Sequence, residues 1–186
     1  MPILARETEL FPEDLLDSPD YSVEGRSWCL LYTLSRREKQ LMRKLLALEV
    51  PFFGPTISRR YRSPNGRMRK SYQPLFPNYV FACMDESQRY VSLTTNCVSK
   101  CVPVFDSTEL VSDLRRIRDL IQMGAQLSPE SRLIAGDRIR VKTGVFAGFE
   151  GVVIHREGKV RLLVAVNFTA QGASFQLDEC QLESIA

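Results

Sequence analysis

The final stretch of the chain constrains the fold most strongly. After Ala135 the sequence consists of short strand-like segments separated by turn residues. Many short strands in so little chain leave many open edges, and closing them into a barrel is a common solution. Residues 135–186 are therefore predicted to form a five-stranded β-barrel, from the segments GDRIRVKTG, FEGVVIHREG, KVRLLVAVNF, ASFQLDE and CQLESI.

The preceding part of the chain mixes strand and helix patterns. WCLLYTL, from Trp28, is a compact apolar run typical of a buried strand. Ser35 and Glu38 have the spacing of a capping box, which predicts a helix from Ser35 that ends before Pro51. QPLFPNYVFACM, from Gln73, predicts an extended segment that enters a buried strand.

Two more helices are expected, over residues 86–95 and 108–123, so residues 27–123 are predicted to form one α+β domain. The polar segment GAQLSPESRL, with a Ser-Pro step, places a linker at residues 124–134. The barrel domain then spans residues 135–186.

The net charge of +3 is unevenly distributed. Residues 1–26 carry two basic and seven acidic side chains, a balance of −5, and they contain prolines without sustained periodicity. Residues 27–125 carry sixteen basic and eight acidic side chains (+8), and residues 126–186 carry seven of each. We therefore expect residues 1–26 to be a flexible acidic extension beside a basic domain.

Several classes of protein are disfavoured by what the sequence lacks. It has one histidine, no C-x-x-C pair and no phosphate-binding loop, so we expect no metal site, no cofactor and no enzymatic activity. Apolar runs are too short to span a membrane, and the acidic start does not resemble a secretory signal. An odd number of scattered cysteines favours buried, unreactive thiols in a reducing, cytoplasmic compartment: Cys29, Cys83, Cys97, Cys101 and Cys180.

Basic residues flank the turn sequence SPNG at residues 63–66. Tyr61 and Tyr72 interleave with them, and no acidic residue lies between. Such a hairpin attracts phosphate, and its tyrosines suit stacking on unpaired bases. The alternatives are contact with an acidic protein surface, or a role in solubility alone. The basic residues are Arg59, Arg60, Arg62, Arg67, Arg69 and Lys70.

Two parts of the sequence resemble a known family. GDRIRVKTGVFAGFEGVVIHREGKVRLLVAV resembles a KOW motif, with glycines in the turn between two strands. The order and spacing of four further features over residues 27–186 resemble the NusG family. These features are W-x-L-L-Y-T at Trp28 to Thr33, the helix after it, the basic hairpin, and PLFPNYVF at Pro74 to Phe81. The PLFPNY wording is closer to RfaH-type specialised paralogues, because general NusG factors tend to have glycine where this chain has Asn78.

The resemblance implies an N-terminal NusG-type domain, an antiparallel sheet flanked by helices, and a C-terminal five-stranded SH3-like KOW barrel. The first domain would bind RNA polymerase through the residues that match the family's docking surface: Tyr32, Phe76, Pro77, Tyr79 and Phe81. The start of the first helix matches the position where RfaH-type proteins contact non-template DNA, with Arg36, Arg37, Lys39 and Gln40. The basic hairpin would lie near upstream DNA.

The barrel would recruit a NusE-like ribosomal protein or Rho through the loop that carries Phe146 and Phe149. Its many valines and glycines favour a permanent barrel over a tail that refolds into helices. We expect a monomeric regulator of transcription elongation and antitermination, specialised rather than general. The alternatives are a general NusG elongation factor and a KOW-type RNA-binding protein that acts in translation.

Overall fold

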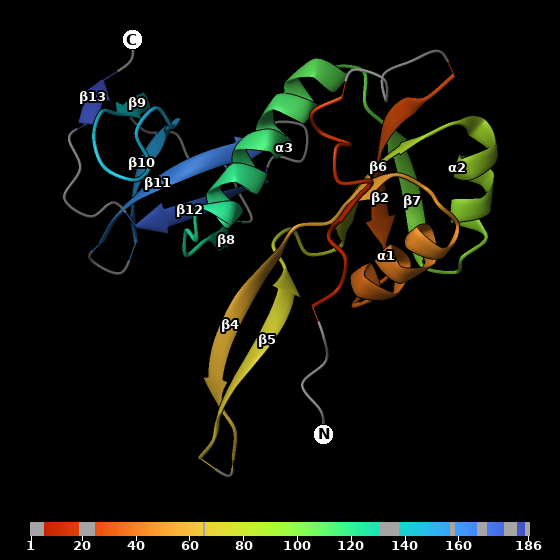
Figure 1. Ribbon diagram of the computed structural model, residues 1–186, viewed down its shortest axis with the longest axis horizontal. Coiled ribbons are helices and arrows are strands. Elements are labelled where there is room, and N and C mark those ends of the chain that lie inside the picture. Colours follow the sequence, from red (N-terminus) through yellow and green to blue (C-terminus); the bar gives the residue numbers. More distant parts are fainter. Residues whose placement is uncertain are drawn as a thin grey trace. The chain divides into compact units, whose positions relative to one another are not determined.

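A computed structural model describes residues 6–18, 25–64, 66–130, 138–156, 159–166, 171–176 and 182–184. The chain separates into two compact units, Met1–Ser107 and Thr108–Ala186 (Figure 1). The third helix, whose sequence was assigned to the first domain, therefore groups with the C-terminal strands. The predicted domain boundaries at 27, 123 and 135 remain predictions.

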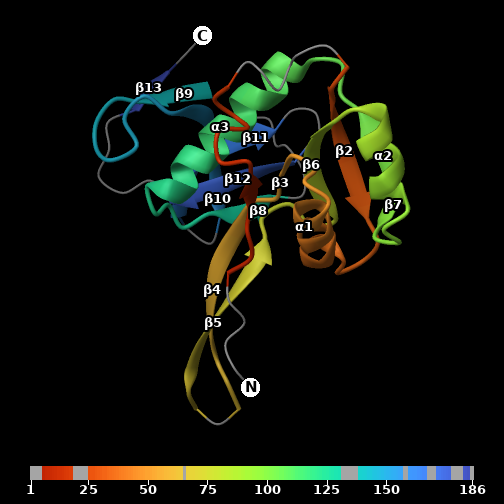
Figure 2. The ribbon, with the colours of Figure 1, turned by 45° about the vertical axis from the view of Figure 1, so that its right-hand side comes forward.

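The first unit is built on an antiparallel sheet with helices, as predicted. The strand order is β1-β3-β6-β2-β7, and every neighbouring pair is antiparallel. The strands are β1 (Leu10–Phe11), β2 (Ser27–Thr33), β3 (Phe52–Phe53), β6 (Tyr79–Met84) and β7 (Val98–Pro103). The helices are α1 (Glu38–Ala47) and α2 (Glu86–Leu93). A separate two-stranded hairpin consists of β4 (Thr56–Arg62) and β5 (Met68–Pro74), and it projects away from the sheet (Figures 1 and 2).

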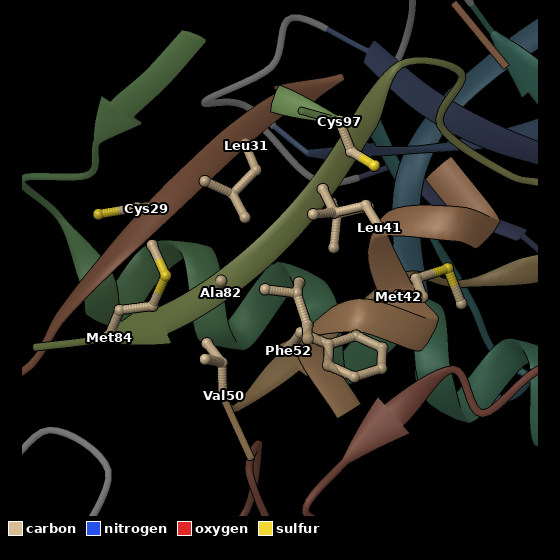
Figure 3. Packing of buried hydrophobic residues seen from close by; sticks show 11 residues of the cluster. Cys29, Leu31, Leu41, Met42, Val50, Phe52, Ala82, Met84 and Cys97 are labelled. Carbon is tan, nitrogen blue, oxygen red and sulfur yellow. The ribbon is translucent and has the colours of Figure 1, made fainter. Parts of the chain in front are cut away.

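Apolar side chains of α1 pack onto one face of this sheet and form its core (Figure 3). Leu41, Met42 and Leu45 recur at helical spacing and are buried, whereas Leu48 beyond the helix is 42% exposed. Four of the seven residues of β2 are buried in succession, because both faces of this strand are covered. The cluster comprises Cys29, Leu31, Leu41, Met42, Leu45, Val50, Phe52, Val80, Ala82, Met84 and Cys97.

The predicted capping box at the first helix is wrong. Helix α1 begins at Glu38, its N-cap is Arg37, and that side chain makes no capping hydrogen bond. Glu38 is buried instead, and its carboxylate accepts a hydrogen bond from another segment. A capping box is present at α2, where Gln88 N–H donates to Asp85 Oδ1 (2.8 Å) and Asp85 N–H donates to Gln88 Oε1 (3.3 Å).

The expected flexibility of the acidic extension does not hold for residues 6–18. Strand β1 extends the sheet, with Leu10 opposite Phe53 and Phe11 opposite Phe52. Leu15 and Leu16 are 2% and 0% exposed. Burial of two leucine side chains stabilises the docked segment by several times the thermal energy. The segment can therefore dock although its sequence has no sustained periodicity.

The second unit contains α3 (Ser107–Gln122) and a six-stranded antiparallel sheet. In both views α3 runs alongside β11 and β12 (Figures 1 and 2). The helix ends as predicted, with Gly124 in the left-handed region (φ 78°). The strand order is β13-β9-β10-β11-β12-β8, with β8 (Ser128–Glu130), β9 (Arg138–Val141), β10 (Glu150–Arg156), β11 (Lys159–Val166), β12 (Gln171–Gln176) and β13 (Leu182–Ser184).

Each of the five C-terminal segments that were expected to form strands contains a strand, and these strands are β9 to β13. The sheet gains a sixth strand, β8, from the segment predicted as a linker, and it pairs with β12. Over the described residues no pairing joins β13 to β8, so closure into a barrel remains a prediction. Among the helices that the structure describes, none is long and apolar enough to cross a membrane.

Candidate functional site

Two tyrosines face each other across β2 and β6. Tyr32 and Tyr79 are directly opposite in the strand register. Their rings pack edge to face, with centroids 5.2 Å apart and an angle of 68° between the ring planes. Tyr32 is 38% exposed, and Tyr79 is half-buried. Pro77, two residues before Tyr79 in sequence, is exposed. We call Tyr32, Pro77 and Tyr79 the tyrosine patch.

The turn before β6 gives the tyrosine patch its shape. Tyr79 N–H donates to the carbonyl of Phe76 at 3.2 Å, and Asn78 lies in the left-handed region (φ 68°). Asparagine and glycine tolerate this conformation better than other residues. Both backbone groups of Asn78 are bonded, with its N–H donating to Glu38 Oε1 (2.8 Å) and its carbonyl accepting from Thr33 N–H (2.8 Å).

The two phenylalanines predicted for the same surface lie inside the unit. Phe76 and Phe81 are 1% and 0% exposed, and their rings meet at 90° with centroids 5.9 Å apart. Sequence alternation cannot separate core from surface here, because both faces of β6 are covered and five of its six residues are buried. Of the five predicted docking residues, three therefore form a surface and two are buried.

The basic hairpin presents cations on both faces. Directly opposite residues share a face, so Arg60 and Lys70 lie on one side, and Arg69 lies on the other side with Tyr61 opposite it. All six predicted basic residues are exposed. Among the ion pairs of the described residues, none includes any of the six. The hairpin thus holds concentrated charge that has no acidic partner within the described part of the chain.

The hairpin tyrosines differ in their environment. Tyr61 is 48% exposed. The ring of Tyr72 is half-buried and already contacts two cations, with Arg6 Cζ 5.7 Å and Lys70 Nζ 5.1 Å from its centroid. Tyr61 is therefore the better placed of the two for stacking on a base. The contact from Arg6 was not predicted, because nothing local links residue 6 to the hairpin.

The start of α1 offers a second group of polar side chains. Arg36 and Arg37 are exposed, and Arg36 adopts a left-handed backbone conformation (φ 60°). Arg37 Nη1 donates to Gln40 Oε1, so these two predicted contact residues bind each other. Lys39 and Gln40 are half-buried.

In the second unit, the loop between β9 and β10 carries both predicted partner-binding residues. Phe146 and Phe149 are half-buried, and the Phe146 ring packs on buried Phe175 with centroids 4.5 Å apart. Val145 is 73% exposed and was not predicted as a contact residue. The loop thus presents one apolar side chain outward and anchors another to the sheet.

Over the described residues, no group of three or more histidine, cysteine, aspartate or glutamate side chains is arranged to hold a metal ion.

Comparison with known proteins identifies the family. A sequence model of NusG, described as "Transcription termination factor nusG", matches residues 26–129, more than half of the chain. The chain belongs to the NusG family. This makes it a non-enzymatic transcription factor, and family membership implies binding to RNA polymerase.

Its relatives include proteins named transcription termination/antitermination protein NusG from several bacteria. The protein from Pseudomonas aeruginosa is 29% identical over 181 residues, which cover 87% of this chain and 99% of the relative. The protein from Escherichia coli K12 is 30% identical over 125 residues, 63% of this chain and 69% of the relative. The NusG match begins at residue 26, so the docked segment 6–18 lies outside it.

Proposed function

We propose that this NusG-like protein is a specialised transcription elongation and antitermination factor that docks on RNA polymerase through the tyrosine patch. The observation that carries the proposal is the exposed Tyr32–Tyr79 pair beside Pro77, held by the bonded turn at Asn78. Rigid, partly exposed aromatic residues often dominate the free energy of protein association. Phe76 and Phe81 are buried as an edge-to-face pair and take no part in this surface.

Nucleic acid is the second proposed partner of the first unit. The six hairpin cations are exposed on both faces of a ribbon that projects from the sheet, which supports contact with the phosphates of upstream DNA. Exposed Arg36 and Arg37, with Lys39 and Gln40, would meet non-template DNA at the start of α1.

For the second unit we propose an SH3-like KOW barrel that recruits a NusE-like ribosomal protein or Rho. Exposed Val145 and half-buried Phe146 support an apolar contact at the loop before β10. General NusG factors tend to have glycine at the position of Asn78, whereas this chain keeps the left-handed turn with asparagine. This difference supports a specialised factor. A general factor would occupy transcribed genes genome-wide, whereas a specialised one would occupy a few operons.

The proposal is tested by binding of the full chain to elongating RNA polymerase. We expect Tyr32→Ala/Tyr79→Ala to weaken binding by more than tenfold, because it removes the aromatic surface. The matched control is Phe105→Ala, which removes a 95% exposed aromatic side chain elsewhere in the first unit. Equal binding by the double variant and the control would refute the docking surface, and binding to ribosomes without polymerase would favour a KOW-type RNA-binding protein.

A further inference from the structure

Two cysteines lie side by side near the edge of the first sheet. In the register of β2 and β7, Cys101 is opposite Leu31 and Cys29 is opposite Pro103. Alternate residues share a face, so both thiols lie on the same side of the sheet as diagonal neighbours. Cys29 is 2% exposed, and half-buried Cys101 packs against the same core cluster.

The two thiols differ in their electrostatic surroundings. Each thiol affects the protonation of the other across the β2–β7 pairing, and the Arg89 guanidinium of α2 acts on both. The interaction with Cys29, and after it the Arg89 guanidinium, lowers the pKa of the Cys101 thiol, although burial and the Glu86 carboxylate act in the opposite direction. The same thiol pair and burial raise the pKa of Cys29, while Ser27 and Arg89 lower it.

The other described cysteines lack this combination. Cys83 and Cys97 are buried, and burial raises the pKa of Cys83 to about 11. Reactive cysteines are typically partly exposed and adjacent to a cation, because the thiolate is the nucleophile. Among the described cysteines, Cys101 alone has partial exposure, a neighbouring arginine and a second thiol as a diagonal neighbour.

We propose that Cys101 is a hydroperoxide-reactive thiol and that Cys29 resolves its oxidised form to an intrachain disulfide between β7 and β2. The Cys101 thiolate attacks one peroxide oxygen, the O–O bond breaks, and hydroxide leaves and takes up a proton. Cys29 sulfur then attacks Cys101 sulfur, and the S–O bond breaks as the S–S bond forms. Two thiols and one hydrogen peroxide thus give one disulfide and two waters, with two electrons passing from sulfur to peroxide.

The place of β7 in the sheet makes the second step feasible. Diagonal neighbours lie about 7–8 Å apart at Cα, and a disulfide needs about 4.4–6.8 Å, so the strands must approach by roughly 1 Å. Among the strands that the structure describes, β7 is at the edge of the sheet and pairs with β2 only, and the register is irregular between Tyr32 and Thr33. An edge strand can make this shift without displacing a second neighbour.

Peptide mapping of the full chain tests the pair. After treatment of the reduced protein with equimolar hydrogen peroxide, we expect a linked Cys29–Cys101 peptide while Cys83 and Cys97 stay reduced. In Cys29→Ser, dimedone should trap a sulfenic acid at Cys101, and Cys101→Ser should give neither product. A Cys180→Ser chain is the control for the cysteine outside the described residues. Oxidation of Cys83 or Cys97 as fast as Cys101, or no Cys29–Cys101 link in the wild-type chain, would overturn the proposal.

Two charge variants on α2 test the reactivity without altering either cysteine. Arg89 and Glu86 form an ion pair at 2.8 Å and act on Cys101 in opposite directions. We expect Arg89→Gln to slow alkylation of Cys101 by iodoacetamide several-fold at about pH 7, and Glu86→Gln to leave it unchanged or faster. The fluorescence of buried Trp28 reports whether each variant is folded. Unchanged alkylation in folded Arg89→Gln would show that the guanidinium does not activate the thiol, contrary to the proposal.

Discussion

The carboxylate of Glu38 accepts a hydrogen bond from the backbone N–H of Asn78 at 2.8 Å, across 40 residues of sequence. Glu38 is the first residue of α1, and Asn78 is the left-handed residue of the turn before β6. This contact joins the proposed non-template-DNA contact region to the proposed polymerase surface. A buried side chain thereby sets the position of a turn that local sequence alone does not determine.

We predict that Glu38→Ala destabilises the first unit by about 1–3 kcal/mol, because the partly buried Asn78 N–H loses its acceptor. Glu38→Gln keeps an oxygen acceptor and should cost less. Urea unfolding followed by Trp28 fluorescence measures both. Equal stability of the alanine variant and the wild-type chain would contradict the structural role given to this bond.

Asn78 should respond to substitution according to its backbone conformation. At φ 68° a residue other than glycine or asparagine is strained by about 1–2 kcal/mol. Asn78→Gly is therefore expected to be nearly neutral and Asn78→Ala destabilising in the same unfolding measurement. The reverse order would show that the Asn78 side chain, rather than its backbone, is what matters.

The docked N-terminal segment should contribute to stability. Leu16→Ala removes a fully buried side chain and is expected to cost about 2–5 kcal/mol. Leu48→Ala, at a 42% exposed position, is the matched control and should change the free energy of unfolding by less than about 0.5 kcal/mol. If both leucines behave alike, segment 6–18 does not dock in solution.

The two faces of the hairpin can be tested separately by the salt dependence of DNA binding. We expect Arg60→Gln/Lys70→Gln and Arg59→Gln/Arg69→Gln each to weaken binding of duplex DNA. Each should reduce the slope of log affinity against log salt by about 2, because each lost phosphate contact removes about 0.9. Arg43→Gln, which removes an exposed cation on α1, is the control. A slope that changes for one double variant only would show that a single face contacts the DNA.

Gly151 should be intolerant of any side chain. A Cβ there would lie 2.4 Å from the Leu163 carbonyl oxygen and 3.0 Å from Leu162 Cγ, so β10 and β11 would have to separate. We predict that Gly151→Ala destabilises the second unit by about 1–3 kcal/mol, measured by circular dichroism in urea. Gly148→Ala is a control with no atom within 4 Å, and its cost comes from the positive φ of +91° alone. A Gly151→Ala chain as stable as wild type would show that the strands yield at this point.

Local patterns predicted most elements of both units because strand and helix periodicity is written into neighbouring residues. Strand β2, helix α3 and the C-terminal strands follow directly from such patterns. The same reasoning failed at Ser35 and Glu38, where the capping-box spacing is present but the glutamate binds a distant backbone group. It also missed the docking of Leu15 and Leu16, since two buried leucines produce no repeating signal.

The sequence by itself determined the kind of protein: an α+β unit, a C-terminal β region, a basic hairpin and the aromatic turn at Pro74 to Phe81. Only the tertiary structure decided which members of these sets are accessible. It buries Phe76 and Phe81, exposes Tyr32 and Pro77, and makes Cys29 and Cys101 diagonal neighbours on adjacent strands. The physical reason is that burial and cross-strand contact depend on residues far apart in the chain, whereas a sequence pattern reports only on near neighbours.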